Sequence, residues 1–282
     1  MDDSRPPSGD ELLEIAFAAA EAGAQVVARR SGKEVAFDTK STETDLVTEL
    51  DKSSEAAIIR VIEDARPLDA IVAEETGVRR DTRSPTQVRW IVDPLDGTTN
   101  FVYGYPAWAV SVCAEVDGSP AAAVVWDPVH TEVYAASRAG PATCNGEEIR
   151  IRPSRGLDRS LFCTGFAYDR DLRSAQGEVL ARLVGRVGNV RRGGSAALDL
   201  CWLAAGRLDA FWEAGLRRWD FAGAALVASR AGADVTDLEG GEPSVRAVVA
   251  ASPGLMPGLR ALLVECGADE VAELASRLVA DG

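Results

Sequence analysis

The chain has 282 residues, of which 46% are hydrophobic and 26% are charged. This apolar fraction excludes a disordered, collagen-like or coiled-coil chain, and the length suffices for a large core without disulfide or metal staples. With 44 acidic and 30 basic residues the net charge is −14, which argues against nucleic-acid binding through a basic face. A phosphorylated substrate remains compatible with this charge if cations separate it from the carboxylates.

The cysteines and the hydropathy pattern bear on the compartment. The five cysteines are widely spaced and form no C-x-x-C pair, which favours reduced, buried thiols. The N-terminus is polar, and no run of 18 uncharged apolar residues occurs, so a secretion signal and a membrane span are both unsupported. We therefore expect a soluble, cytoplasmic protein.

Two helices are expected first, followed by short β-rich segments. Ser8 to Glu11 has the form of a capping box, and apolar residues at helical spacing predict a helix over about residues 10–30. A second helix is predicted over about 50–65, with Thr48 as its cap. Strands are predicted over 69–73, 89–92, 108–116, 121–126 and 131–136. We interpret them as an antiparallel meander that the two helices cover on one face.

After Pro153 strands and helices alternate, which is typical of a layered α/β unit. Strands are predicted over 161–164, 186–190, 208–212 and 247–250, and helices over 174–184, 195–205, 221–231, 255–266 and 269–278. The expected fold class is a layered sandwich of an α+β and an α/β part. We expect its two halves, residues 1–150 and 151–282, to pack tightly.

The stretch from Asp93 to Phe101 says most about chemistry. Asp93 and Asp96 are three residues apart, flank a proline and precede Gly97, directly after a predicted strand. Magnesium is typically held by a few carboxylates together with water and substrate phosphate. A glycine turn at a strand end can also aim backbone N–H groups at an anion. For a bare pattern of this kind, an ordinary Asp-Gly turn is the alternative interpretation.

Further acidic residues fall at the ends of predicted elements. Glu74 and Glu75 follow an apolar strand and would repel each other unless cations neutralised them. Asp220 opens a predicted helix, where it fits an N-cap as well as a metal ligand. The sole histidine, His130, belongs to a predicted turn, and the chain has neither a G-x-S-x-G nor a Gly-rich nucleotide-binding motif. These observations disfavour a Ser-His-Asp hydrolase and a nucleotide-binding loop.

Together these segments resemble the inositol monophosphatase family, within the superfamily of lithium-sensitive, magnesium-dependent phosphatases. The resemblance covers nearly the whole chain, in the segments 40–51, 73–75, 93–101, 193–198, 209–213 and 219–224. It implies alternating α-β-α-β-α layers, a homodimer, and a small phosphorylated alcohol as substrate, with no nucleic-acid or membrane partner. Ala73 stands where the family usually has Gly, and Leu95 where Ile is commoner; we expect both departures to be harmless.

The resemblance also implies two or three magnesium ions per site. Glu74, Asp93 and the backbone carbonyl of Leu95 would bind the first ion. Asp93 would bridge to a second ion, which Asp96 and Asp220 also hold, and a third, weaker ion would lie beside Glu74. All of these ligands are oxygen atoms, as hard divalent cations require.

Catalytic and substrate-contacting residues follow from the same resemblance. The backbone amides of Gly97 and Thr98 would hold the phosphate. Thr98, supported by Asp51, would orient the attacking water together with Glu74. Three residues would contact the leaving alcohol, with the last accepting hydrogen bonds from its hydroxyl groups: Gly194, Ala196 and Glu213.

The sequence therefore predicts a magnesium-dependent phosphomonoesterase that acts on inositol monophosphates by in-line attack of water, without a covalent intermediate. A histidinol-phosphate or fructose-1,6-bisphosphate phosphatase on the same fold is an alternative, and an arginine facing the site, Arg191 or Arg192, would favour a second phosphate. Some bacterial family members resemble non-catalytic scaffolds that bind the transcription machinery. The complete set of acidic residues argues against that alternative.

Overall fold

The structure is a computed structural model of the chain and describes residues 7–29, 37–40, 46–78 and 87–280. Its helices are α1 (Gly9–Ala28), α2 (Glu49–Ala65), α3 (Thr98–Tyr103), α4 (Arg170–Leu183), α5 (Ala196–Ala204), α6 (Arg218–Arg230), α7 (Met256–Glu265) and α8 (Ala268–Ala280), with a 3₁₀ turn at Leu157–Arg159. Within the described ranges, no helix is long and apolar enough to cross a membrane.

The strands form two large sheets and a short ribbon in the part of the chain that the structure describes. The ribbon pairs β1 (Phe37–Thr39) with β2 (Leu46–Thr48). The first sheet contains β3 (Ala70–Ala73), β4 (Gly77–Val78), β5 (Val88–Asp96), β6 (Ala109–Val116), β7 (Ser119–Asp127), β8 (Glu132–Ser137), β9 (Thr143–Cys144) and β10 (Glu147–Glu148). The second contains β11 (Leu161–Thr164), β12 (Asn189–Arg191), β13 (Ala210–Glu213), β14 (Asp234–Thr236) and β15 (Val248–Ala251).

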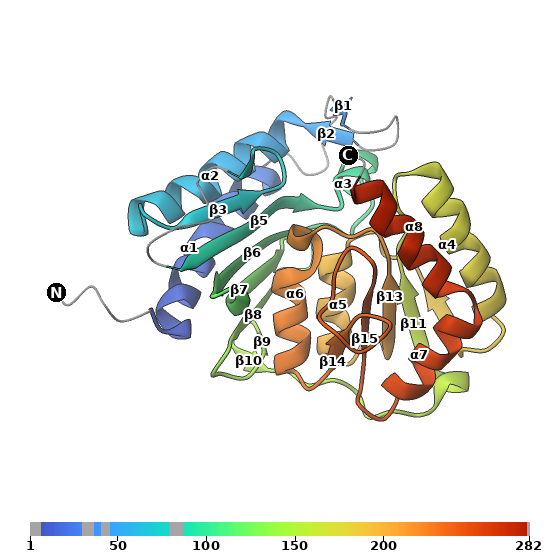
Figure 1. Ribbon diagram of the computed structural model, residues 1–282. Coiled ribbons are helices and arrows are strands. Elements are labelled where there is room, and N and C mark those ends of the chain that lie inside the picture. The colour runs from blue at the N-terminus through green and yellow to red at the C-terminus, as the bar shows by residue number, and fades with distance from the viewer. Residues whose placement is uncertain (1–6, 30–36, 41–45, 79–86, 281–282) are drawn as a thin grey trace.

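Helices α1 and α2 cover the outer face of the first sheet (Figure 1). Both begin with a capping box, Ser8 with Glu11 in α1 and Thr48 with Asp51 in α2, which satisfies otherwise unpaired N–H groups. Strands β5 to β8 form the expected antiparallel meander. β3 departs from it, since it pairs parallel to β5. The parallel pairing brings the carboxyl ends of β3 and β5 to the same edge of the sheet.

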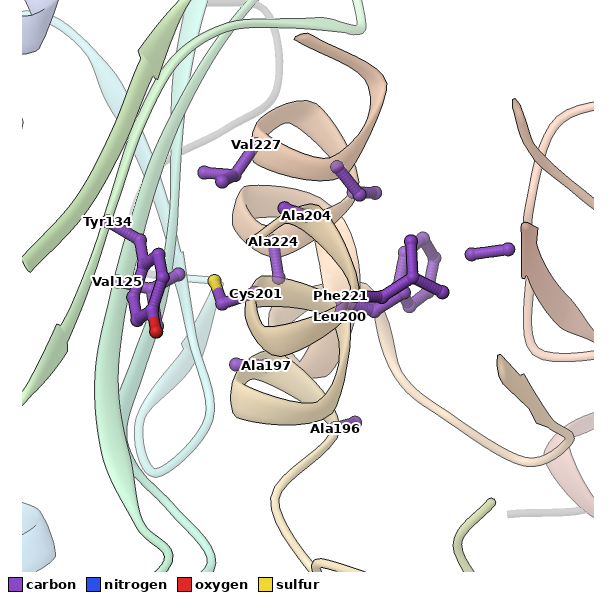
Figure 2. Close-up of a cluster of buried hydrophobic side chains, with 14 of the residues drawn as sticks. Val125, Tyr134, Ala196, Ala197, Leu200, Cys201, Ala204, Phe221, Ala224 and Val227 are labelled. Carbon is purple, nitrogen blue, oxygen red and sulfur yellow. The ribbon is translucent and has the colours of Figure 1, made fainter. Parts of the chain in front are cut away.

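Helices α5 and α6 form the central layer between the two sheets. Figure 2 shows Val125 and Tyr134 of the first sheet on one side of these helices. The side chains of Leu200 in α5 and Phe221 in α6 point to the other side. The core around them contains residues from both sides of position 150, so the two halves share one interior. The expected division into 1–150 and 151–282 stays a prediction.

The second sheet has the order β12-β11-β13-β15-β14, and α4, α7 and α8 cover its far face. The molecule therefore has the layers α-β-α-β-α (Figure 1), which confirms the expected layered sandwich. Each layer buries an apolar face that no single helix or sheet could hide alone.

Some element boundaries differ from the sequence prediction. Helix α4 begins at Arg170, earlier than expected, because the Asp169 side chain caps it by accepting hydrogen bonds from the Asp171 and Leu172 N–H groups. Strand β12 lies at Asn189–Arg191 rather than 186–190. Helix α6 begins at Arg218, so Asp220 lies inside its first turn and is not the N-cap residue.

Candidate active site

A pocket lies where the carboxyl ends of β3 and β5 meet the first turns of α3, α5 and α6. It is lined by Glu74, Asp93, Leu95, Asp96, Gly97, Thr98, Gly165, Phe166, Tyr168, Arg192, Gly194, Ala196, Glu213, Leu216 and Asp220. Every residue expected to bind metal or contact substrate is in this set. Asp51 is the exception among the expected site residues, and it lies behind Thr98. The tertiary structure thus brings together residues that are up to 146 positions apart, from Glu74 to Asp220.

Three aspartates of the pocket are anchored by the chain around them. Asp93 Oδ1 accepts a hydrogen bond from the Leu95 N–H at 3.0 Å. Asp96 Oδ2 accepts from Ser195 Oγ at 2.6 Å and from the Ala197 N–H at 2.8 Å, so the start of α5 holds it. Asp220 Oδ2 accepts from the backbone N–H of the residue before α6 at 2.6 Å. These bonds restrict the directions in which the carboxylates point.

The pocket concentrates negative charge. Burial raises the pKa of Glu74 to about 7 and that of Asp96 to about 6. Burial is also the main reason that the pKa values of Asp93 and Asp220 lie well above their usual range, and the neighbouring carboxylates raise them further. The Lys40 ammonium group offsets part of this charge, with Nζ 2.8 Å from Glu74 Oε1. Such a group of acids favours either bound protons or bound cations.

Thr98 opens α3 directly after Gly97, which adopts a left-handed conformation with φ +92°. A Cβ atom at position 97 would lie 2.9 Å from the Ala107 carbonyl oxygen, so glycine is required there. Thr98 Oγ1 lies 2.9 Å from Asp51 Oδ1 and 3.0 Å from the Leu95 carbonyl oxygen, and donates to them. The first N–H groups of a helix have no acceptor within the helix and remain available to an anion.

Helix α2 supports the site through three buried polar side chains on one face. Asp51 accepts from Thr98, and Ser54 Oγ donates to the Pro94 carbonyl at 2.9 Å. Glu55 accepts from the backbone N–H groups of Glu75 at 2.7 Å and Thr76 at 3.0 Å. The sequence prediction missed Ser54 and Glu55. Their spacing from Asp51, at i+3 and i+4, is the signal that places all three on one helix face.

Glu213 lines the pocket from the second sheet, at the end of β13, and is 7% exposed. Its carboxylate packs against Gly165 so closely that a Cβ atom there would overlap it. Burial, followed by repulsion from Asp199, raises the pKa of Glu213 well above its usual range. A Cβ on Gly194, which has φ +86°, would overlap the guanidinium group of Arg192.

The structure also shows which of the two neighbouring arginines faces the pocket. Arg192 lines it, whereas Arg191 Nη1 donates to Asn189 Oδ1 at 3.1 Å and to the Val190 carbonyl at 2.9 Å. Asn100, which the sequence prediction also missed, holds the adjacent loop: its Nδ2 donates to the Gly193 carbonyl at 2.9 Å. Of the segment 40–51 used for the resemblance, residues 41–45 lie outside the described residues.

Comparison with known proteins identifies the family. The model of the inositol monophosphatase family matches residues 8–268. The chain belongs to this family. The Nus factor SuhB of Vibrio cholerae serotype O1 is 38% identical over 256 residues, covering 89% of this chain and 94% of the relative.

Solved structures of the family have the same fold. The extragenic suppressor protein suhB from Bartonella henselae superposes with a TM-score of 0.83 at 32% identity, covering 90% of this chain and 98% of that one. The inositol monophosphatase from Anabaena (Nostoc) sp. superposes with a TM-score of 0.79 at 32% identity, covering 91% and 96%. Membership supports a phosphatase of a generally metal-dependent kind.

The donor set of the pocket fits such a metal. Glu74, Asp93, Asp96 and Asp220 offer carboxylate oxygens, and no thiolate or imidazole lines the described part of the pocket. This chemistry suits magnesium rather than zinc or copper. Among the described residues, no three Asp, Glu, His or Cys side chains are already arranged around a single point where they could hold a metal ion. The Lys40 ammonium group, 2.8 Å from Glu74 Oε1, would compete with a bound ion for this carboxylate.

In the absence of magnesium, the free energy of unfolding of the protein should fall as the pH rises from about 5 to about 8. In the unfolded chain these carboxyl groups ionise near pH 4, whereas the folded protein keeps protons on Glu74 and Asp96 up to about pH 7 and about 6. The unfolded state then binds fewer protons, so stability falls with pH. Thermal unfolding in EDTA should show this fall, and millimolar Mg²⁺ should reverse it at pH 8. A melting temperature in EDTA that rises across this interval would contradict the prediction.

Proposed function

We propose that the protein is a magnesium-dependent phosphomonoesterase that hydrolyses inositol monophosphates. The convergence of Glu74, Asp93, Asp96 and Asp220 on one pocket, beside the first turn of α3, carries this proposal. Phosphate monoesters are among the slowest substrates to hydrolyse unaided, so the site must stabilise much charge in the transition state. A pocket of hard oxygen ligands next to free backbone N–H groups is suited to that task.

The proposed mechanism assigns each group one task. The four carboxylates and the Leu95 carbonyl would hold two or three magnesium ions, which when bound lower the pKa of a bound water and neutralise phosphate charge. The N–H groups of Gly97 and Thr98 would bind the phosphate oxygens. With its hydrogen donated to Asp51, the Thr98 hydroxyl accepts a hydrogen bond from the attacking water and so orients it. Glu74 would accept the proton that this water loses.

The part of the pocket around Glu213 would select the leaving alcohol. Glu213 is buried, acts as an acceptor when ionised and lines the same pocket as the four proposed metal ligands. Gly194 and Ala196 line the same pocket, and the Arg192 guanidinium group lies beside Gly194. An inositol ring offers several uncharged hydroxyl groups to one carboxylate, which supports inositol monophosphates over substrates with an apolar leaving group.

Phosphate release at millimolar Mg²⁺ tests the proposal. The substrates compared would be inositol 1-phosphate, histidinol phosphate, fructose 1,6-bisphosphate and adenosine 3′,5′-bisphosphate. We expect inositol 1-phosphate to give the highest kcat/KM. A bisphosphate in first place would instead support the alternative substrate class, which Arg192 at the pocket favours because its guanidinium group can bind a second phosphate.

A non-catalytic role is the second candidate, because relatives at 38% identity bear the name Nus factor SuhB. The protein would then act as a homodimeric or monomeric scaffold for transcription components. Recovery of RNA polymerase components in a pull-down, with no phosphate release from any of the four substrates, would favour this role. Phosphatase activity lost by substitution of a pocket carboxylate would favour the enzyme.

A further inference from the structure

A fully buried carboxylate outside the pocket, Glu115 on β6, joins two layers of the fold. Arg89 reaches its Oε2 atom through Nε at 2.9 Å and Nη2 at 2.5 Å. Arg218 reaches its Oε1 atom through Nε at 2.7 Å and Nη2 at 2.6 Å. Each carboxylate oxygen thus has its own guanidinium partner, and such charge-assisted bonds fix geometry as well as contributing energy.

The two arginines differ in where they come from. Arg89 is the direct cross-strand neighbour of Glu115 in the β5–β6 pairing, so this half of the network lies within one sheet. Arg218 is the first residue of α6 and belongs to the central layer. The Arg218–Glu115 pair is therefore a directional link between α6 and the sheet beneath it.

Small residues let the first half of α6 approach the sheet closely, and larger buried residues, Leu226 and Val227, follow in its second half. Gly223 packs over Ser111 and Cys113, and a Cβ atom there would lie 2.9 Å from Ser111 Oγ. Ala222, Ala224 and Ala225 are buried beside it. Apolar burial is non-directional, whereas hydrogen bonds fix the two ends of α6: Arg218 binds Glu115 at its start, and Arg230 Nε donates to the Gly140 carbonyl at 2.7 Å at its end.

Asp220 lies in the same helical turn as Arg218, two residues further on. Its Oδ2 atom accepts from the Arg217 N–H, which ties the carboxylate to that turn. Asp93 lies on β5, next to β6 in the sheet. The separation of Asp220 from Asp93 across the pocket therefore depends on where the first turn of α6 rests on the β5–β6 surface.

We propose that Arg218 is a positioning residue which, by binding Glu115, holds Asp220 in the pocket beside Asp93, where both carboxylates would bind a divalent cation. The inference rests on the proposed function in treating Asp220 as a metal ligand. Arg89 binds the same carboxylate from within the sheet, as the cross-strand neighbour of Glu115. The two arginines thus form a matched pair that separates positioning from stabilisation.

The test compares Arg218→Met with Arg89→Met in the full chain. Both substitutions remove one guanidinium group from Glu115 and leave the other, so both should lower the melting temperature. Calorimetric titration with Mn²⁺ in the absence of substrate measures metal affinity directly. The affinity of Arg218→Met for Mn²⁺ should be about 10-fold or more weaker than that of the unmodified protein, as for other residues that orient a metal ligand. Arg89→Met should bind Mn²⁺ as the unmodified protein does. Hydrolysis of p-nitrophenyl phosphate should recover in Arg218→Met at high Mg²⁺.

Arg218→Lys adds a variant that keeps the charge and one donor to Glu115, and its Mn²⁺ affinity should lie between those of Arg218→Met and the unmodified protein. Equal affinity losses in the two Met variants would show a merely stabilising network and overturn the inference. Unchanged affinity in Arg218→Met, or in Arg218→Lys if the Met variant does not fold, would also overturn it. If the unmodified protein itself binds no Mn²⁺, the proposed metal-dependent function fails. If it binds Mn²⁺ but Arg218→Met binds it equally well, only the positioning role of Arg218 fails.

Discussion

Asp93→Asn should remove most of the turnover while the fold persists. Asp93 is 1% exposed and lies among Glu74, Asp96 and Asp220, whose charges all act on it. Asparagine has the same shape, and its carbonyl oxygen can still accept the Leu95 N–H. What it lacks is the negative charge that would bridge two cations, so kcat for phosphate release should fall at least about 100-fold, beyond the range typical of indirect ligand partners.

The stability of Asp93→Asn gives an independent readout. In EDTA at pH 8 the variant should melt at a higher temperature than the unmodified protein, because one member of a repelling set is gone. Asp127→Asn is a suitable control: Asp127 is also buried, but it accepts from the Val129 and His130 N–H groups in a turn outside the pocket. This control should lose stability and retain kcat. Near-normal activity of Asp93→Asn would refute its role as a metal ligand.

Glu213→Ala should reduce hydrolysis of inositol 1-phosphate far more than that of p-nitrophenyl phosphate. A hydrogen bond to a charged group contributes about 1.5–3 kcal/mol, so the loss in kcat/KM for the inositol ester should be about 10- to 100-fold. p-Nitrophenyl phosphate has no hydroxyl groups on its ring and should be affected little.

Glu213→Gln provides the matched comparison. It keeps the volume that packs against Gly165 and retains one acceptor oxygen, so it should preserve more inositol-phosphate activity than Glu213→Ala. Comparable losses on both substrates in Glu213→Ala would show that Glu213 does not recognise the alcohol, and would point to a structural role at the end of β13.

Features with a local cause were predictable from the sequence. Capping boxes at Ser8 and Thr48 specify where α1 and α2 begin, because the partners lie within three residues of each other. The alternation of strands and helices after Pro153 predicted the layered α/β part, whereas the family resemblance implied the full order of layers. The acidic motif at Asp93 and Asp96 could be recognised because its residues are adjacent in the chain. Family resemblance supplied the remaining site residues, and all of these except Asp51, which bonds Thr98, line one pocket.

Only the tertiary structure decided which side chains hold the site together. Ser195 bonds Asp96 across 99 positions, Glu55 holds the turn after β3, and Arg218 reaches Glu115 from another layer. None of these partners is set by local propensity, because each depends on how separate layers pack against one another. The same holds for Arg192 rather than Arg191 facing the pocket: Arg191 ends β12 and Arg192 begins the loop after it, and only the packing of that loop determines which side chain reaches the site.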